Sequence, residues 1–169
     1  DVLYWKYGNK KILRDNFSMI LKWMQYVEHQ AATSFIKPVE EYTPEELERQ
    51  KYLWNTEFHF GDWLYPSSAE SGNGNPIEGA LKTKEYVAPA MFAYTSRLMS
   101  EICEILGEKE KAKYYAELNK KIRSAYAGEY IDAQGRLPLE LQGLYVLALK
   151  MELFPQEKQK AGMEHLKEL

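Results

Sequence analysis

The chain has little of what disulfide-linked, membrane-spanning or nucleic-acid-binding proteins require. Cys103 is the single cysteine among 169 residues, so neither an internal disulfide nor a cysteine metal site can form. Charged residues interrupt the apolar stretches, and residues 1–11 lack the basic and apolar parts of a signal peptide. The net charge is −3, and lysine and arginine are mixed with glutamate rather than clustered. We therefore expect neither a nucleic-acid nor a membrane partner, and the compartment stays open.

Histidine is also scarce, which argues against a metal centre. His29, His59 and His165 lie far apart in the sequence and do not have the spacing of metal ligands. We expect no metal and no other cofactor. Apolar residues make up 45% of the chain and charged residues 28%, which predicts a folded domain with a core. The 13 tyrosines and 4 tryptophans suit either a core between helices or a carbohydrate-binding surface.

Periodic apolar residues predict two helices in the first third of the chain. Between residue 12 and about residue 29, apolar side chains recur as on one face of a helix. These are Leu13, Phe17, Ile20, Leu21, Met24 and Val27. Thr43 and Pro44 then provide the N-cap and first residue of a short helix over residues 44–52. Residues 67–79 are rich in serine, glycine and asparagine and predict a loop.

The middle of the chain predicts a helical hairpin. A long helix is expected to end at Gly107, with Pro89 near its start. Its predicted apolar face consists of Val87, Met91, Tyr94, Leu98, Ile102 and Ile105. Cys103 lies within this pattern, so we interpret it as a small buried apolar residue. A second helix over residues 109–127 carries its own apolar face, formed by Ala112, Tyr115, Leu118, Ile122 and Tyr126.

The C-terminal part predicts a turn and two further helices. The sequence DAQG at 132–135 is typical of a turn, Pro138 is expected to open a helix that reaches about residue 151, and Pro155 precedes a last helix. No series of strands is evident. The predicted fold class is therefore all-α, built of antiparallel helical hairpins whose connections alternate between short and long. Stacked hairpins and a helical barrel both have this organisation.

The stretch HFGDWLYP, residues 59–66, has neither helical period nor ordinary turn chemistry. A sugar presents C–H bonds on its faces and hydroxyls at its rim, so a sugar site combines a flat aromatic ring with a charged acceptor. Trp63 beside Asp62 offers this combination, and Gly61 lets the backbone approach closely. Hydrogen bonds to a carboxylate are about twice as strong as neutral ones. The alternative is structural, with Phe60 and Trp63 packed in the core and Asp62 capping a helix.

Segments in a fixed order give the chain a resemblance to a known family. They are YWKYGNKKILRDNFSMILKWMQYV, then FHFGDWL, then TKEYVAPAMFAYTSRLMSEICEILGEKEKAKYYAELNKKIRSAY, then LQGLYVLALKMEL. Together they resemble the catalytic domain of the bacterial α-L-rhamnosidases of glycoside hydrolase family 78, with FGDWL as the most specific element. The resemblance implies an (α/α)6 barrel of the six-hairpin glycosidase type. Residues 1–169 would form a single partial domain of that type, roughly half of the barrel.

The resemblance also implies site residues that contact a rhamnoside substrate. In the family, FGDWL is a loop at the mouth of the barrel that touches the sugar, which assigns substrate contacts to Asp62 and Trp63. Gln142 matches a glutamine near the same mouth, although residues 139–141 depart from the acidic and threonine residues expected there. His59 is a further candidate that donates to a sugar hydroxyl, with packing beside the aromatics as the alternative.

No catalytic residue is assigned to this chain. Hydrolysis with inversion, which the resemblance implies, needs a general acid and a general base about 6.5–9.5 Å apart. In the family, the acid lies in an acidic motif upstream of the matched region, and the base is a glutamate shortly after a tryptophan downstream. Residues 14–16 and 54–57 match neither motif. We therefore expect the chain to be inactive alone and to act as a fragment of a larger bacterial hydrolase.

Three further points stay open. A half-barrel would leave apolar helix faces uncovered, so self-association through those faces is one expectation. Tyr4, Trp5 and Tyr7 are interpreted as a packed helix end, with the barrel interior as the alternative. The alternatives to a rhamnosidase fragment are another six-hairpin glycosidase and a non-catalytic protein-interaction module of helical hairpins, in which FGDWL is a structural plug.

Overall fold

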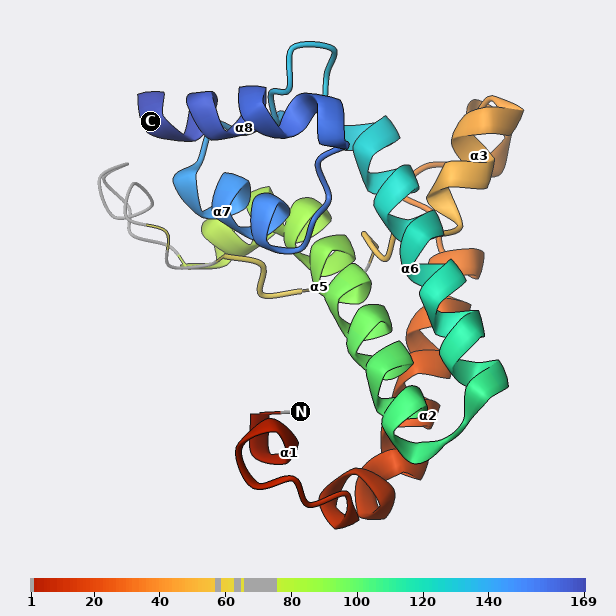
Figure 1. Cartoon of the computed structure of the whole chain (residues 1–169). Helices are drawn as coiled ribbons and strands as arrows, with labels where there is room; N and C mark the ends of the chain where they lie inside the picture. The colour runs from red at the N-terminus through yellow and green to blue at the C-terminus, as the bar shows by residue number, and fades with distance from the viewer. Residues whose placement is uncertain (1, 57–58, 63–64, 66–75) are drawn as a thin grey trace.

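A computed structural model describes residues 2–56, 59–62, 65 and 76–169, and in these ranges the chain is helical without strands. The helices are α1 (Val2–Tyr7), α2 (Lys11–Thr33), the 3-10 helix η1 (Val39–Glu41), α3 (Pro44–Gln50), α5 (Pro76–Leu106), α6 (Lys109–Tyr130), α7 (Gln142–Lys150) and α8 (Gln156–Glu168). The predicted all-α class is confirmed. Figure 1 shows α5 and α6 as an antiparallel hairpin, with α2 beside it and α7 and α8 at one end.

The two predicted N-terminal helices are present. α2 buries Leu13, Met24 and Val27 as expected and continues past His29 to Thr33. α3 begins as predicted, because Thr43 and Glu46 form a capping box. The Thr43 hydroxyl accepts from the Glu46 backbone N–H at 3.2 Å, and the Glu46 carboxylate accepts from the Thr43 backbone N–H at 2.8 Å.

The α5–α6 hairpin is confirmed, but the predicted core face of α5 is confirmed only in part, because Ile102 is buried and Val87 packs against the core while other members are not buried. Met91 is 38% exposed and Tyr94 and Leu98 are half-buried, whereas the neighbouring stripe is buried. That stripe consists of Phe92, Ala93, Ser96, Met99 and Cys103. The physical reason is that apolar residues surround much of α5, so periodicity alone does not select the face. Small residues decide it instead, because they let α6 approach closely.

Polar contacts fix the register of this hairpin. The Asn119 amide of α6 donates to the Ala93 carbonyl at 2.7 Å and to the Ser96 hydroxyl at 3.2 Å. The Ser100 hydroxyl donates to the Ala112 carbonyl at 2.8 Å. The predicted face of α6 is confirmed, since Ala112, Tyr115, Leu118, Ile122 and Tyr126 are all buried. Cys103 is fully buried, as expected, and burial raises the pKa of its thiol to about 11.

Two predicted helix starts are corrected by the structure. α5 begins at Pro76, so the last residues of the predicted loop 67–79 are helical and Pro89 lies well inside the helix. α7 begins at Gln142 rather than at Pro138. The helix begins after Leu141, whose backbone is extended with φ −114° and ψ 124°. Ahead of it, the Leu137 backbone N–H donates to the Tyr145 hydroxyl at 3.0 Å. The turn at 132–135 and the helix after Pro155 are confirmed.

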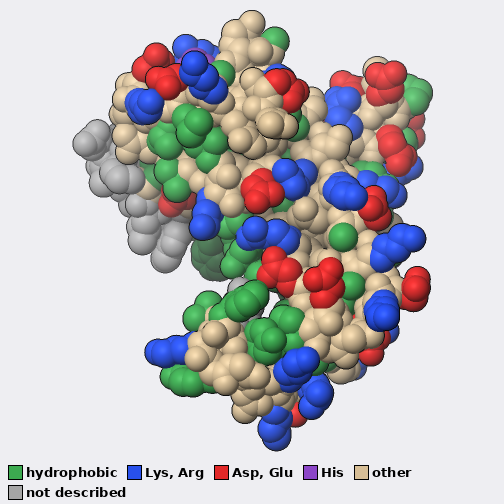
Figure 2. All heavy atoms as spheres, viewed as in Figure 1, with side chains coloured by type: hydrophobic (Ala, Val, Ile, Leu, Met, Phe, Trp, Pro, Cys, Tyr) green, Lys and Arg blue, Asp and Glu red, His purple; other side chains and the backbone are tan. Residues whose placement is uncertain are grey.

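The N-terminal helix α1 corrects another expectation. It contacts α2, and none of its residues is buried. Trp5 is 69% exposed and Tyr7 is 67% exposed, so the interpretation of these two residues as a packed helix end is wrong within this chain. Tyr4 is half-buried, and its ring meets the Trp5 ring edge-on at 5.7 Å. Figure 2 shows hydrophobic side chains gathered over this lower part of the molecule. An exposed apolar patch is typical of a surface that contacts another protein or domain.

Candidate functional site

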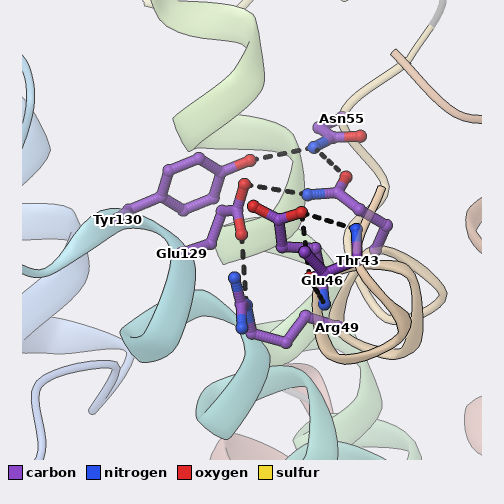
Figure 3. Close-up of polar contacts among 7 residues, drawn as sticks. Thr43, Glu46, Arg49, Asn55, Glu129 and Tyr130 are labelled. Atoms are coloured by element: carbon purple, nitrogen blue, oxygen red, sulfur yellow. Dashed lines mark hydrogen bonds and ion pairs between the residues drawn. The ribbon is translucent and has the colours of Figure 1, made fainter. Parts of the chain in front are cut away.

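The segment that leads to HFGDWLYP starts from a buried polar network between α3 and α6. The Asn55 amide donates to the Gln50 side-chain oxygen at 3.1 Å and to the Tyr130 hydroxyl at 2.9 Å. The Gln50 amide donates to Glu129 at 2.9 Å, and the Arg49 guanidinium binds the same carboxylate at 3.2 Å (Figure 3). Because Gln50 and Asn55 are each only 1% exposed, this network fixes where the chain leaves α3.

The burial of Tyr130 keeps this network in one protonation state. Burial is the main cause that raises the pKa of its phenol, and the hydrogen bond from Asn55 opposes it in part. The phenol therefore stays neutral at physiological pH and its oxygen can accept from Asn55. Its ring packs edge-on against Tyr86 of α5 at 5.1 Å and Tyr126 of α6 at 4.9 Å, which joins α5 and α6 to the start of the loop.

His59 lies within an aromatic row that extends from α2. Its ring meets the Trp54 ring edge-on at a centroid distance of 4.3 Å, and Trp54 in turn meets Trp23 of α2 at 5.7 Å. His59 is half-buried in this arrangement. The structure therefore gives His59 a packing contact, and its proposed contact with a sugar stays a prediction.

Gly61 brings the loop against α5. Its φ of +55° lies in the left-handed region. A β-carbon at this position would lie 2.4 Å from the Thr83 hydroxyl oxygen and 2.9 Å from the Lys84 backbone nitrogen, so only glycine fits. The Asp62 backbone N–H donates to the buried Thr83 hydroxyl at 2.7 Å, and that hydroxyl donates to the Gly79 carbonyl at 2.8 Å.

The structure brings Asp62 to the start of α7. A β-carbon built on Gly143, the second residue of α7, would lie 2.8 Å from Asp62 Oδ2. Gln142 is the first residue of this helix and is exposed. A carboxylate beside the first turn of a helix is stabilised by the helix dipole, by about 0.3–1 kcal/mol. Two candidates separated by 80 positions, Asp62 and Gln142, thus lie in one region.

Trp63, the remaining candidate, lies outside the described residues, and its role stays a prediction. Thr83 and Gly143 are site residues that the sequence analysis missed. A threonine inside a helical pattern gives no signal for Thr83. For Gly143 a signal was available, because an isolated glycine in a helical pattern often marks a close approach.

Two further depressions on the described surface lie away from these candidates. A depression between α3 and α6 is lined by Glu45, Tyr52 and Lys121, and another lies between α6 and residues 152–155, and neither contains Asp62, His59 or Gln142. The described residues contain no group of at least three histidine, cysteine or acidic side chains suited to a metal ion. Within the same ranges, no helix is long and apolar enough to cross a membrane.

Comparison with known proteins defines the class. The profile of the bacterial α-L-rhamnosidase six-hairpin glycosidase domain matches residues 1–169. The α-L-rhamnosidase of Streptomyces avermitilis is 26% identical over 164 residues, which cover 97% of this chain and 13% of that protein. The α-L-rhamnosidase of Formosa agariphila is 26% identical over 168 residues, which cover 98% of this chain and 15% of that protein.

A solved structure agrees with the sequence match. The crystal structure of the Streptomyces avermitilis α-L-rhamnosidase complexed with L-rhamnose superimposes with a TM-score of 0.70 at 25% identity and covers 96% of this chain and 12% of that one. The fold thus belongs to the six-hairpin glycosidases as a partial helical barrel. The chain is a member of the bacterial α-L-rhamnosidase six-hairpin glycosidase domain family. It spans less than one-sixth of the length of these relatives.

Proposed function

We propose that this chain supplies part of the sugar-binding site of an enzyme that hydrolyses terminal α-L-rhamnosides. The observation that carries the proposal is the meeting of the Asp62 loop with the start of α7, which carries Gln142. A relative of this chain was crystallised with L-rhamnose, which supports a rhamnoside as the substrate. The larger polypeptide, not the isolated segment, would carry the activity.

Each candidate has a defined chemical role in this proposal. The Asp62 carboxylate accepts hydrogen bonds from sugar hydroxyls, while the Gln142 amide both donates and accepts. Trp63 covers a C–H face of the ring. His59, which packs against Trp54, is a further candidate that donates to a sugar hydroxyl. These contacts orient the substrate. Orientation lowers the activation barrier of hydrolysis, because the bound substrate has less translational and rotational freedom to lose in the transition state.

The general acid and base are assigned to parts of the domain outside this chain. The 169-residue chain should therefore release no product from an aryl α-L-rhamnoside. The complete protein should hydrolyse this substrate in preference to other aryl glycosides. Inversion is tested by NMR of the first product, because an inverting enzyme converts an α-linked rhamnoside to the β-anomer. First formation of the α-anomer would contradict the inverting mechanism.

Substitution of Asp62 tests the assignment of its role. In the complete protein, Asp62→Asn keeps the size and removes the charge, so we expect kcat/KM to fall at least about tenfold, or about 1.4 kcal/mol. The melting temperature should hardly change. The matched control is Asp15→Asn on α2, where Asp15 is exposed and pairs with Lys11, and its kinetics should be unchanged. Earlier melting of Asp62→Asn with normal kinetics per folded molecule would show a structural role instead.

A second candidate function has one observation in its favour. The exposed apolar residues of α1, among them Val2, Trp5 and Tyr7, suit a protein-interaction surface. In that case the isolated chain should self-associate and bind a hydrophobic dye, and the complete protein should retain the same surface. If the complete protein hydrolyses rhamnosides and loses dye binding, the α1 surface is covered within the domain and the interaction module is excluded.

A further inference from the structure

Gly143 is a glycine with no conformational need to be one. It lies in the first turn of α7, and its φ is not in the left-handed region. Among the described residues, the atom that an added β-carbon would meet within 4 Å is Asp62 Oδ2, at 2.8 Å. That distance is shorter than real β-carbon contacts. The space that the glycine leaves is therefore filled by the carboxylate.

Whether an added β-carbon meets backbone or a movable side chain determines which part of the structure a glycine substitution displaces. At Gly61 an added carbon would meet backbone atoms, and at Gly162 it would meet the buried Phe154 ring at 2.7 Å, so both positions constrain the fold. At Gly143 it would meet the free end of a short side chain, which can rotate away. The backbone of α7 would stay in place, and the carboxylate would move.

We propose that Gly143 is a positioning residue that sets the place of the Asp62 carboxylate against the first turn of α7. The proposal rests on the sugar-contact role of Asp62 stated above. The Thr83 hydroxyl fixes the Asp62 backbone, and the space at Gly143 admits the carboxylate beside the positive end of the helix dipole. A group that accepts sugar hydroxyls must be held within about 0.5 Å of its productive position, so this space affects recognition directly.

The test is Gly143→Ala in the complete protein, assayed on an aryl α-L-rhamnoside. We expect kcat/KM to fall about tenfold while the melting temperature stays the same or rises, because alanine is the better helix residue. A residue with a purely structural role would lower both together. The control is Gln156→Ala at the exposed first residue of α8, which likewise places alanine in the first turn of a helix. Its kinetics should be unchanged.

A double-mutant cycle with Asp62→Ala shows whether Gly143 acts through the carboxylate. Once the carboxylate is removed, the added methyl group displaces nothing, so Gly143→Ala should have no further effect on kcat/KM. In amide NMR spectra of the 169-residue chain, the Gly143 resonance should shift on Asp62→Asn. An unchanged resonance would overturn the contact.

The outcomes separate this inference from the proposed function. If Asp62→Asn lowers kcat/KM but Gly143→Ala does not, the positioning role is wrong and the proposed function stands. If neither variant affects kcat/KM, the sugar-contact role of Asp62 fails and the inference fails with it. A loss on Gly143→Ala that persists unchanged in the Asp62→Ala background would also overturn the inference.

Discussion

The α5–α6 hairpin and the loop that carries Asp62 are held by different means. The hairpin buries apolar side chains along its length, and its few polar contacts fix only its register. The loop is held by the Asn55 network at one end, by the Thr83 hydroxyl at the other, and by glycines where the chain approaches a helix. The hairpin therefore determines stability, while the loop determines the place of a few polar atoms.

The largest effect on stability should come from the hairpin. Ile122 of α6 is fully buried, so Ile122→Ala removes apolar contacts and leaves a cavity. We expect a loss of about 2–5 kcal/mol in the free energy of unfolding, measured by urea denaturation of the 169-residue chain. Lys120→Ala, at an exposed neighbour on α6, is the control and should change stability by less than about 0.5 kcal/mol. Equal losses would mean that the hairpin core is not formed in solution.

Gly61→Ala should affect both stability and recognition. It forces alanine into a left-handed conformation, at a cost of about 1–2 kcal/mol, and also pushes the loop away from the Thr83 hydroxyl and the Lys84 backbone. We expect hydrolysis by the complete protein to fall more than about tenfold.

Gly107→Ala is the matched control for this substitution. Gly107 has a φ of +84°, and an added carbon would meet nothing within 4 Å. It should lose similar stability, because the backbone strain is similar, but it should keep normal kinetics per folded molecule. Equal kinetic losses in Gly61→Ala and Gly107→Ala would show that general destabilisation, not displacement of the loop, lowers the activity.

A smaller effect is expected for Thr83→Val. The substitution keeps the shape and removes the hydroxyl that accepts from the Asp62 backbone N–H. We expect the free energy of unfolding to fall by about 1 kcal/mol. We also expect kcat/KM to fall about fivefold, because the Asp62 backbone loses its hydrogen bond to Thr83. Thr95→Val is the control, because the Thr95 hydroxyl donates within its own helix to the Met91 carbonyl. A normal kcat/KM for Thr83→Val would mean that Gly61 alone places the loop.

The last effect depends on pH and concerns the single thiol of the hairpin. Burial raises the pKa of Cys103 to about 11 from an ordinary value near 9, so the unfolded chain releases this proton at lower pH than the folded chain. Its contribution to stability is complete below about pH 9 and falls as the pH rises toward 11, by at most about 1.4 kcal/mol per pH unit. This contribution is measured as the difference in the free energy of unfolding between the unchanged chain and Cys103→Ala, determined by urea denaturation from pH 8 to 10.5. A difference independent of pH would contradict the burial of the thiol.

The sequence predicts the hairpin better than the loop for a physical reason. Apolar periodicity reports which helix face is buried, and on α6 this identified Tyr115, Ile122 and Tyr126 correctly. On α5 it identified Ile102 correctly but also placed the exposed Met91 on the core face, because apolar residues cover sides of the helix that do not face α6, and small residues such as Ala93 and Ser96 take part in the contact. Pattern alone also missed the start of α7, because the extended conformation of Leu141 is not visible in the apolar pattern.

The candidate site was predictable in its chemistry and not in its geometry. A carboxylate, a tryptophan and a glycine in FGDWL indicate a sugar site because of what these groups can bind. The meeting of Asp62 with Gly143 depends on how α5 and α7 pack, and no period in the sequence encodes that distance. Thr83 is likewise recognisable only from the hydrogen bond that it makes.

The central claim is that the junction between the Asp62 loop and the start of α7 binds the sugar. A crystal structure of the complete protein with L-rhamnose tests it most directly. We expect a sugar hydroxyl within about 2.5–3.0 Å of the Asp62 carboxylate, with the Gln142 side chain beside the same sugar. A sugar bound at the catalytic centre that leaves both Asp62 and Gln142 out of hydrogen-bonding range would contradict the claim.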